Sequence, residues 1–143
     1  ITVLEEEAML TDPEEAVRFV EETDVDYLAV AIGTAHGFYK GEPKIHFERL
    51  EQISRAVRVP LVLHGGSGVP DQLVQRAIRF GIAKVNVDTE LRCAFVEGLQ
   101  FAFKHKPQEY HLSELYREAK KRLKEKVKEK IKCFGSSGRA NLR

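Results

Sequence analysis

The sequence predicts an α/β protein with parallel strands, because an apolar strand, a loop and an amphipathic helix follow one another three times along the chain. The strands are predicted over 26–32, 59–64 and 83–87. The first two are nearly unbroken apolar runs, which is typical of strands buried on both faces of a parallel sheet, and the third alternates apolar with polar residues. Glycine or polar residues follow each run, as expected where a strand gives way to a loop.

The intervening segments carry helix signals. The first helix is predicted over 13–22, because Asp12 is placed to cap it, Pro13 fits its first turn and Glu15 can close a capping box. Apolar residues at helical spacing predict further helices over 47–57, 73–78 and 89–102. A last helix is predicted from Ser113 to Ile131, with charged faces exposed to solvent and a flexible tail behind it. We therefore divide the chain into residues 1–110, the strand–helix units, and residues 111–143, the C-terminal helix and tail.

Three parallel strands leave two open edges, which natural proteins rarely expose. A closed eightfold barrel has no edges, but it typically needs about 250 residues. The sequence therefore predicts the C-terminal portion of a TIM (β/α)8 barrel, namely its last three βα units plus C-terminal helices. A small open α/β sheet is the alternative.

Composition excludes several classes of protein. A formal net charge of +1 argues against nucleic acid as a partner, and no apolar run approaches the roughly 20 residues that span a membrane. No secretory signal is evident in the first residues. Cys93 and Cys133 lie far apart with no metal-binding spacing, which favours a reduced, cytoplasmic protein.

Two histidines follow neighbouring strands. His36 comes after the first strand and His64 ends the second, so their backbones are expected about 5 Å apart in the sheet direction. Two neutral imidazoles at that spacing can share Zn²⁺, and a catalytic zinc usually takes three protein ligands. Local hydrogen bonding of each histidine is the alternative.

Two turns next to each other favour phosphate binding. The segment Gly65-Gly66-Ser67-Gly68 leads into a helix opened by Pro70, so its amides and the Ser67 hydroxyl can meet an anion near a helix N-terminus. The turn over 86–89 offers similar groups at the next helix start. In barrels, the loops after the last two strands often hold a phosphate.

Lys84 shares one face of the third strand with Asn86 and Asp88, because side chains alternate along a strand. A buried lysine there could form a Schiff base with a carbonyl substrate. Pairing with a carboxylate is the more ordinary role.

Taken together, these blocks resemble one family. The segments YLAVAIGTAHG (27–37), LHGGSG (63–68) and KVNVDTELR (84–92) are similar to the signatures of class II fructose-bisphosphate and tagatose-bisphosphate aldolases. The similarity extends from about Thr11 to Ala140. It implies a zinc-dependent lyase of glycolysis that cleaves a ketose 1,6-bisphosphate, with fructose 1,6-bisphosphate as the expected substrate, to dihydroxyacetone phosphate and glyceraldehyde 3-phosphate. The residues leave the fructose and tagatose epimers both open.

The resemblance also implies roles for single residues. His36 and His64 would be two of three zinc ligands, and the substrate phosphate site would consist of Gly37, Gly65, Gly66, Ser67, Asn86, Val87, Asp88 and Thr89. Some members also bind a monovalent cation (Na⁺ or K⁺) near the loops of Gly37 and Ser67. Members are homo-oligomers, dimers or tetramers.

The departures from the family pattern concern catalysis. The third zinc histidine of the family follows its catalytic aspartate directly, and this chain has no Asp-His pair. The family's mobile-loop glutamate should lie just upstream of Ile1, so no catalytic acid or base is expected within residues 1–143. An N-terminal half of the barrel is the expected partner, and these residues alone are expected to be inactive. His46 stands at a helix start where many members have a capping aspartate.

Three other functions remain open. A Schiff-base aldolase would use Lys84, and chelators would not inhibit it. A different phosphate-handling barrel, such as an isomerase, would use His36 and His64 without metal. A non-catalytic sugar-phosphate-binding module would bind dihydroxyacetone phosphate and never turn over.

Overall fold

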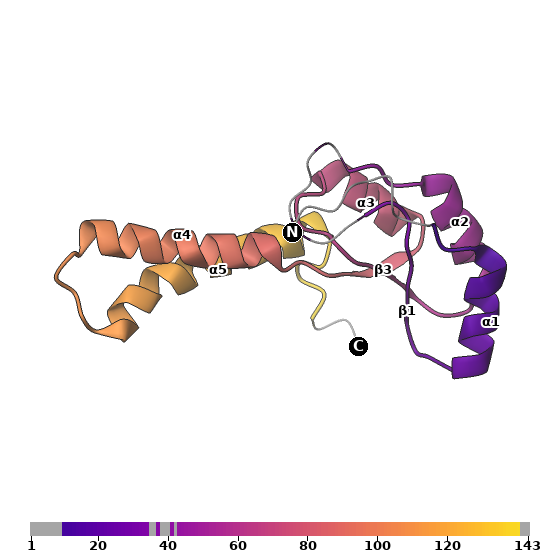
Figure 1. The fold of residues 1–143 in the computed structure, drawn as a ribbon, viewed down its shortest axis with the longest axis horizontal. Coiled ribbons are helices and arrows are strands. Elements are labelled where there is room, and N and C mark those ends of the chain that lie inside the picture. The colour runs from indigo at the N-terminus through magenta and orange to yellow at the C-terminus, as the bar shows by residue number, and fades with distance from the viewer. Residues whose placement is uncertain (1–9, 35–36, 38–40, 42, 141–143) are drawn as a thin grey trace. The chain divides into compact units, whose positions relative to one another are not determined.

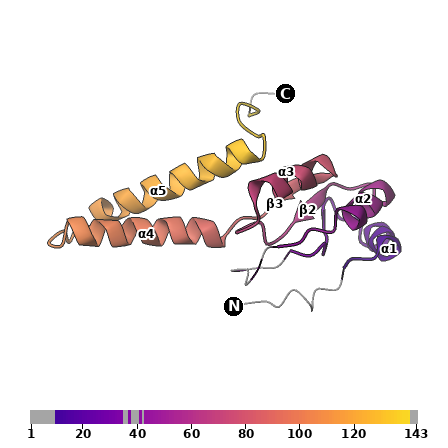
Figure 2. The same ribbon diagram turned by 90° about the horizontal axis from the view of Figure 1, so that it is seen from above.

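The computed structural model describes residues 10–34, 37, 41 and 43–140. Its elements are labelled in Figures 1 and 2 and run in the order α1 (Pro13–Thr23), β1 (Leu28–Ala29), α2 (Phe47–Ala56), β2 (Leu61–Leu63), α3 (Asp71–Arg79), β3 (Ile82–Val85), α4 (Thr89–His105) and α5 (Leu112–Cys133). They form two compact units, of which the first ends at Val87 and the second begins at Asp88.

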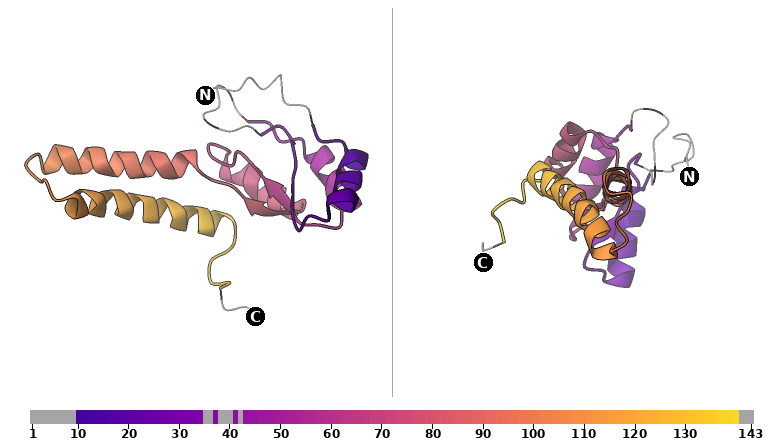
Figure 3. Two further views of the ribbon diagram at one scale, coloured as in Figure 1. Left: turned by 60° about the horizontal axis from the view of Figure 1, so that its bottom comes forward. Right: turned by 90° about the vertical axis from the view of Figure 1, so that its left-hand side faces the viewer.

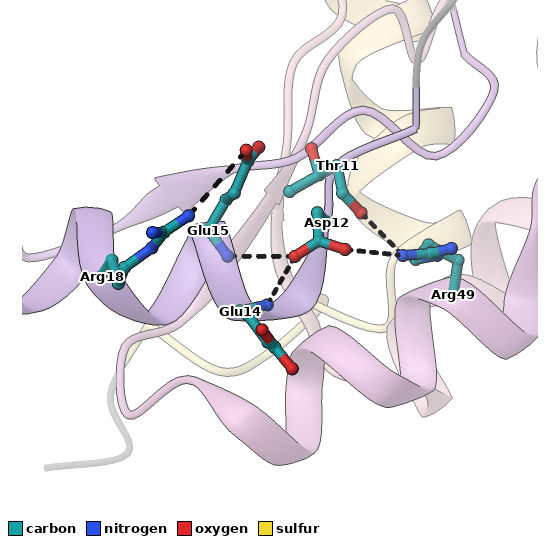
Figure 4. Close-up of polar contacts among 6 residues, drawn as sticks. All are labelled: Thr11, Asp12, Glu14, Glu15, Arg18 and Arg49. Carbon is teal, nitrogen blue, oxygen red and sulfur yellow. Dashed lines mark hydrogen bonds and ion pairs between the residues drawn. The ribbon is translucent and has the colours of Figure 1, made fainter.

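Helix α1 starts as its sequence predicts. The Asp12 carboxylate accepts hydrogen bonds from the backbone N–H groups of Glu14 (2.9 Å) and Glu15 (3.1 Å), and Pro13 occupies the first turn. Figure 4 shows this cap together with Arg49 of α2, whose guanidinium lies 3.8 Å from Asp12. Such a cap stabilises a helix by about 1 kcal/mol. The cap therefore fixes the residue at which α1 begins.

The sheet is parallel, with the strands in chain order β1-β2-β3. Because parallel crossovers are right-handed, this order places α2 and α3 on the same face of the sheet; Figure 2 shows them there. The core beneath them is closely packed, since the side chains of Leu50, Ile53, Leu61, Leu63 and Val74 are almost completely buried. The predicted α/β fold with a parallel sheet is confirmed.

The first strand differs from its prediction. Regular pairing covers only Leu28–Ala29, although 26–32 was expected. Leu28, Val30 and Ile32 are buried, whereas Ala29 and Ala31 are exposed. The expectation of burial on both faces is therefore wrong for this strand in the described chain, because the crossover helices cover one face only. The exposed positions carry alanine, which leaves little apolar surface in water.

The second unit is a pair of helices, α4 and α5, which lie side by side in Figure 3. A Cβ atom added to Gly98 would lie 2.5 Å from the Cα of Ala119, so glycine permits a backbone approach that no other residue would allow. The Lys130 ammonium lies 2.9 Å from the Glu90 carboxylate and joins the far end of α5 to the start of α4.

The boundary at Val87/Asp88 differs from the division after residue 110 that the sequence suggested. The boundary falls before α4 because α4 packs along α5. Whether α4 belongs with the strand–helix units in a longer chain stays a prediction. Within the described part of the chain, every helix is too short or too polar to cross a membrane.

Candidate functional site

The predicted site residues of the first unit gather at the carboxyl ends of β2 and β3. His64 follows β2 directly, and Asn86 follows β3 directly. Two backbone hydrogen bonds join the segments beyond the strands: Asn86 N–H donates to the Leu63 carbonyl (2.9 Å), and Gly66 N–H donates to the Asn86 carbonyl (3.0 Å). The parallel ladder thus continues past the regular strands and holds the two ends in register.

Gly66 is needed for this approach. A Cβ atom there would lie 2.6 Å from Cγ1 of Val85 and 2.8 Å from the Asn86 carbonyl oxygen, and real side chains do not tolerate such distances. Its N–H group serves the ladder, so the contribution of Gly66 is close packing of the turn against β3. The predicted part of this turn in a phosphate site stays a prediction.

The rest of the glycine-rich turn is compact and leads into α3. Gly65 and Gly68 have φ values of 67° and 78°, in the left-handed region that favours glycine. Ser67 between them is 5% exposed. Pro70 then precedes the first residue of α3, as predicted. This places a buried hydroxyl beside the N-terminus of a helix, where an anion is favoured.

The loop after β1 reaches the same place. The Thr34 hydroxyl donates a hydrogen bond to the backbone carbonyl of His64 (2.8 Å). His36 lies two residues further along the sequence, outside the described residues, so its predicted metal role stays a prediction. Gly37 has a φ of 97°. Sequence reasoning missed Thr34, although a hydroxyl so close to His36 was a usable signal.

Asn86 connects the two strand ends through its side chain. Its Nδ2 lies 2.8 Å from Nδ1 of His64, and its Oδ1 accepts a hydrogen bond from the Lys84 ammonium. The predicted shared face of Lys84 and Asn86 is confirmed by this contact. This contact of Lys84 is with an amide oxygen, although a carboxylate is the more ordinary partner of a lysine, and the Schiff-base role stays a prediction.

The remaining predicted residues lie at the unit boundary. Val87 ends the first unit, and Asp88 and Thr89 open the second, where Asp88 pairs with Arg92 of α4 (2.7 Å). Their predicted part in a phosphate site stays a prediction. His46 precedes α2, and its side chain makes no capping hydrogen bond to that helix.

The metal that the family resemblance implies can be tested against His64. Its imidazole is exposed at the end of β2, with Nδ1 2.8 Å from Nδ2 of Asn86, and a neutral imidazole is a side chain that zinc accepts as a ligand. No group of three histidine, cysteine or carboxylate side chains suited to a metal occurs in the part of the chain that the structure describes. His64 has the chemistry of a zinc ligand, and its metal role stays a prediction.

Comparisons with known proteins agree on one family. The model of class II fructose-bisphosphate aldolases matches residues 2–139. A sulfofructosephosphate aldolase from Alkalicoccus urumqiensis is 53% identical over 140 residues, which are 98% of this chain and 49% of that protein.

Solved structures give the same result. The YdjI aldolase from Escherichia coli K12 matches with a TM-score of 0.80 and 47% identity, over 92% of this chain and 48% of that one. A putative fructose-1,6-bisphosphate aldolase from Coccidioides immitis matches with a TM-score of 0.83 and 30% identity, over 94% and 46%. The chain thus spans about half the length of these relatives.

Proposed function

Because the chain belongs to the class II fructose-bisphosphate aldolase family, we propose that it is the part of a zinc-dependent aldolase that supplies metal ligands and the phosphate site. In the longer protein it would form the last three βα units of a (β/α)8 barrel. The observation that carries this proposal is the meeting of His64, the Ser67 turn and Asn86 at the carboxyl ends of β2 and β3. Barrel enzymes place their active sites at this end of the strands.

The reaction is the reversible aldol cleavage of a ketose phosphate to dihydroxyacetone phosphate and an aldehyde. Zinc held by His64, His36 and a third ligand would supply a Lewis acid that polarises the substrate carbonyl. Ser67 and its turn would bind the substrate phosphate. Asn86 would orient the reacting end through its amide. The proton would be moved by an acid/base from outside residues 1–143.

Two substrates have specific support. The resemblance favours fructose 1,6-bisphosphate, and the name of the 53% identical relative favours a sulfofructose phosphate. Homo-oligomer formation, a monovalent cation near Gly37 and Ser67, and a cytoplasmic location stay predictions.

We expect the full-length protein to cleave a ketose phosphate only when zinc is present. Metal-stripped protein should be assayed with fructose 1,6-bisphosphate, tagatose 1,6-bisphosphate and sulfofructose phosphate, before and after zinc is added back. Restored release of dihydroxyacetone phosphate from one of the three would support the proposal. Activity that survives chelation, or covalent trapping by borohydride at Lys84, would contradict it.

Replacing Ser67 with glutamate is expected to weaken dihydroxyacetone phosphate binding by roughly 100-fold or more, because like charges brought together cost several kcal/mol. Ser67→Ala should weaken it only several-fold, since a neutral hydrogen bond contributes about 1 kcal/mol. Calorimetric titration measures both, and the alanine variant covers the case in which glutamate disrupts the buried turn. Zinc content should stay at the wild-type level in both variants. A parallel loss of zinc would show that the phosphate and metal sites are not separate.

A further inference from the structure

The hydrogen bonds between β1 and β2 end in a side chain. One of them joins the Val30 N–H group to the Val62 carbonyl (3.4 Å), and in a parallel pair donor and acceptor both advance by two residues from one bond to the next. The next acceptor is therefore the carbonyl of His64, and its expected donor would be the N–H group of Ile32. That carbonyl receives the hydroxyl of Thr34 at 2.8 Å. The hydroxyl thus occupies the place that the backbone of a longer β1 would take.

The chain leaves β2 just before Thr34 because its backbone is engaged elsewhere. The carbonyl of Ile32 accepts a hydrogen bond from the His46 N–H group (2.9 Å), at the start of α2. Gly33 follows with a φ of 100°, and a Cβ atom added to it would collide with the carbonyl oxygen of Lys44. The segment after β1 therefore lies against the segment that leads into α2. The Thr34 hydroxyl bridges from this diverging segment back to the end of β2.

The other side of the same strand end is held by the segment after β3. Asn86 N–H donates to the Leu63 carbonyl (2.9 Å), and Gly66 N–H donates to the Asn86 carbonyl (3.0 Å). His64 lies between these two bonds in the sequence. Its backbone is therefore fixed from both sides, by two backbone bonds towards β3 and by the Thr34 hydroxyl towards β1.

We propose that Thr34 is a positioning residue, whose hydroxyl takes the place of a backbone donor and fixes the peptide from which the His64 imidazole projects. The consequence for zinc rests on the proposed function; the role in the sheet does not. The His64 side chain is exposed, so its position depends mainly on the backbone that carries it. Zinc tolerates ligand distances only within about 0.2 Å of the ideal value. A looser backbone at His64 should therefore weaken zinc binding.

The test compares three variants of the full-length protein. Thr34→Val removes the hydroxyl and keeps the branched shape of the side chain, whereas Thr34→Ser keeps a hydroxyl. Thr23→Val is the matched control, because the Thr23 hydroxyl also donates to a backbone carbonyl, that of Phe19 (2.5 Å) in α1. The control removes the same kind of hydrogen bond from a helix instead of from the strand ends.

The first measurement is amide hydrogen exchange in the metal-free protein, read at the N–H groups of Gly66 and Asn86. Exchange should become roughly fivefold faster in Thr34→Val, the factor that corresponds to one neutral hydrogen bond. Thr34→Ser should restore the slow exchange. Thr23→Val should leave it at the wild-type rate, because strand ends open locally and not through the helix.

The second measurement is zinc affinity, determined by competition with a fluorescent chelator. Thr34→Val should bind zinc several-fold to about 10-fold more weakly than the wild type, since groups that orient a ligand contribute to metal affinity without touching the metal. Thr34→Ser should bind zinc nearly as tightly as the wild type, and Thr23→Val should bind it equally tightly.

Exchange rates and zinc affinity in Thr34→Val that match those of Thr23→Val would overturn the proposal. Faster exchange with unchanged zinc affinity would also overturn it, provided that His64→Ala loses zinc. Failure of the proposed function looks different: His64→Ala would keep its zinc, while exchange at Gly66 and Asn86 still separated Thr34→Val from Thr23→Val.

Discussion

Replacing His64 with alanine in the full-length protein is expected to remove zinc and to lower the rate of aldol cleavage by at least about 10²–10³-fold. Deleting one preorganised charge-stabilising group from an active site lowers the rate by this range. The loss here should be at least as large, because removing His64 would also remove the zinc ion that polarises the substrate carbonyl. His64 is exposed at the end of β2, so its side chain contributes little to packing. We therefore expect the fold to survive, and zinc content with steady-state kinetics measures the effect.

His111→Ala provides the comparison, because His111 is also an exposed histidine next to a regular element, at the start of α5. It should keep zinc and activity. Full zinc content and turnover in His64→Ala would show that His64 is not a ligand, and the assignment of the metal to the end of β2 would have to be abandoned.

The second large effect concerns residues 1–143 expressed alone, for which we expect no measurable aldolase activity. They span about half the length of their relatives, and no group of three side chains suited to a metal occurs among the residues that the structure describes. The alanine-lined face of β1 is open to water, and its outer side lacks a neighbouring strand among the described residues. Such an edge promotes aggregation.

Co-expression with the N-terminal half should restore solubility, stoichiometric zinc and cleavage together. Light scattering, metal analysis and a coupled assay follow the three properties in the same samples. Activity of residues 1–143 by themselves would mean that an acid/base lies within them and that the assigned roles are incomplete.

Much of the fold could be predicted from local patterns. The cap at Asp12 and the buried run of β2 both depend on neighbours in sequence, and both are found in the structure. The extent of β1 could not be predicted in this way. Its length depends on which surfaces cover it, and an apolar run looks the same whether one face or two are packed.

The candidate site was predictable in residue type but not in detail. Spacing alone brought His64 and Asn86 to neighbouring strand ends, because parallel strands in chain order have their carboxyl ends together. It did not reveal that the Gly66 amide is used within the sheet or that Thr34 bonds to the His64 carbonyl. Those contacts depend on distances of tenths of an ångström, which a spacing pattern does not contain.

The sequential strand order has a consequence for how the first unit forms during synthesis. Each strand pairs with the one that precedes it in the chain, so no strand waits for a partner made much later. Contacts between near neighbours in sequence cost little loop-closure entropy and form quickly. At about 5–20 residues per second, the ribosome delivers each new strand–helix pair over seconds. Every added unit can therefore dock, as it emerges, on the edge left by the strand before it, and the edge that β3 will cover is never exposed for longer than the synthesis of one unit.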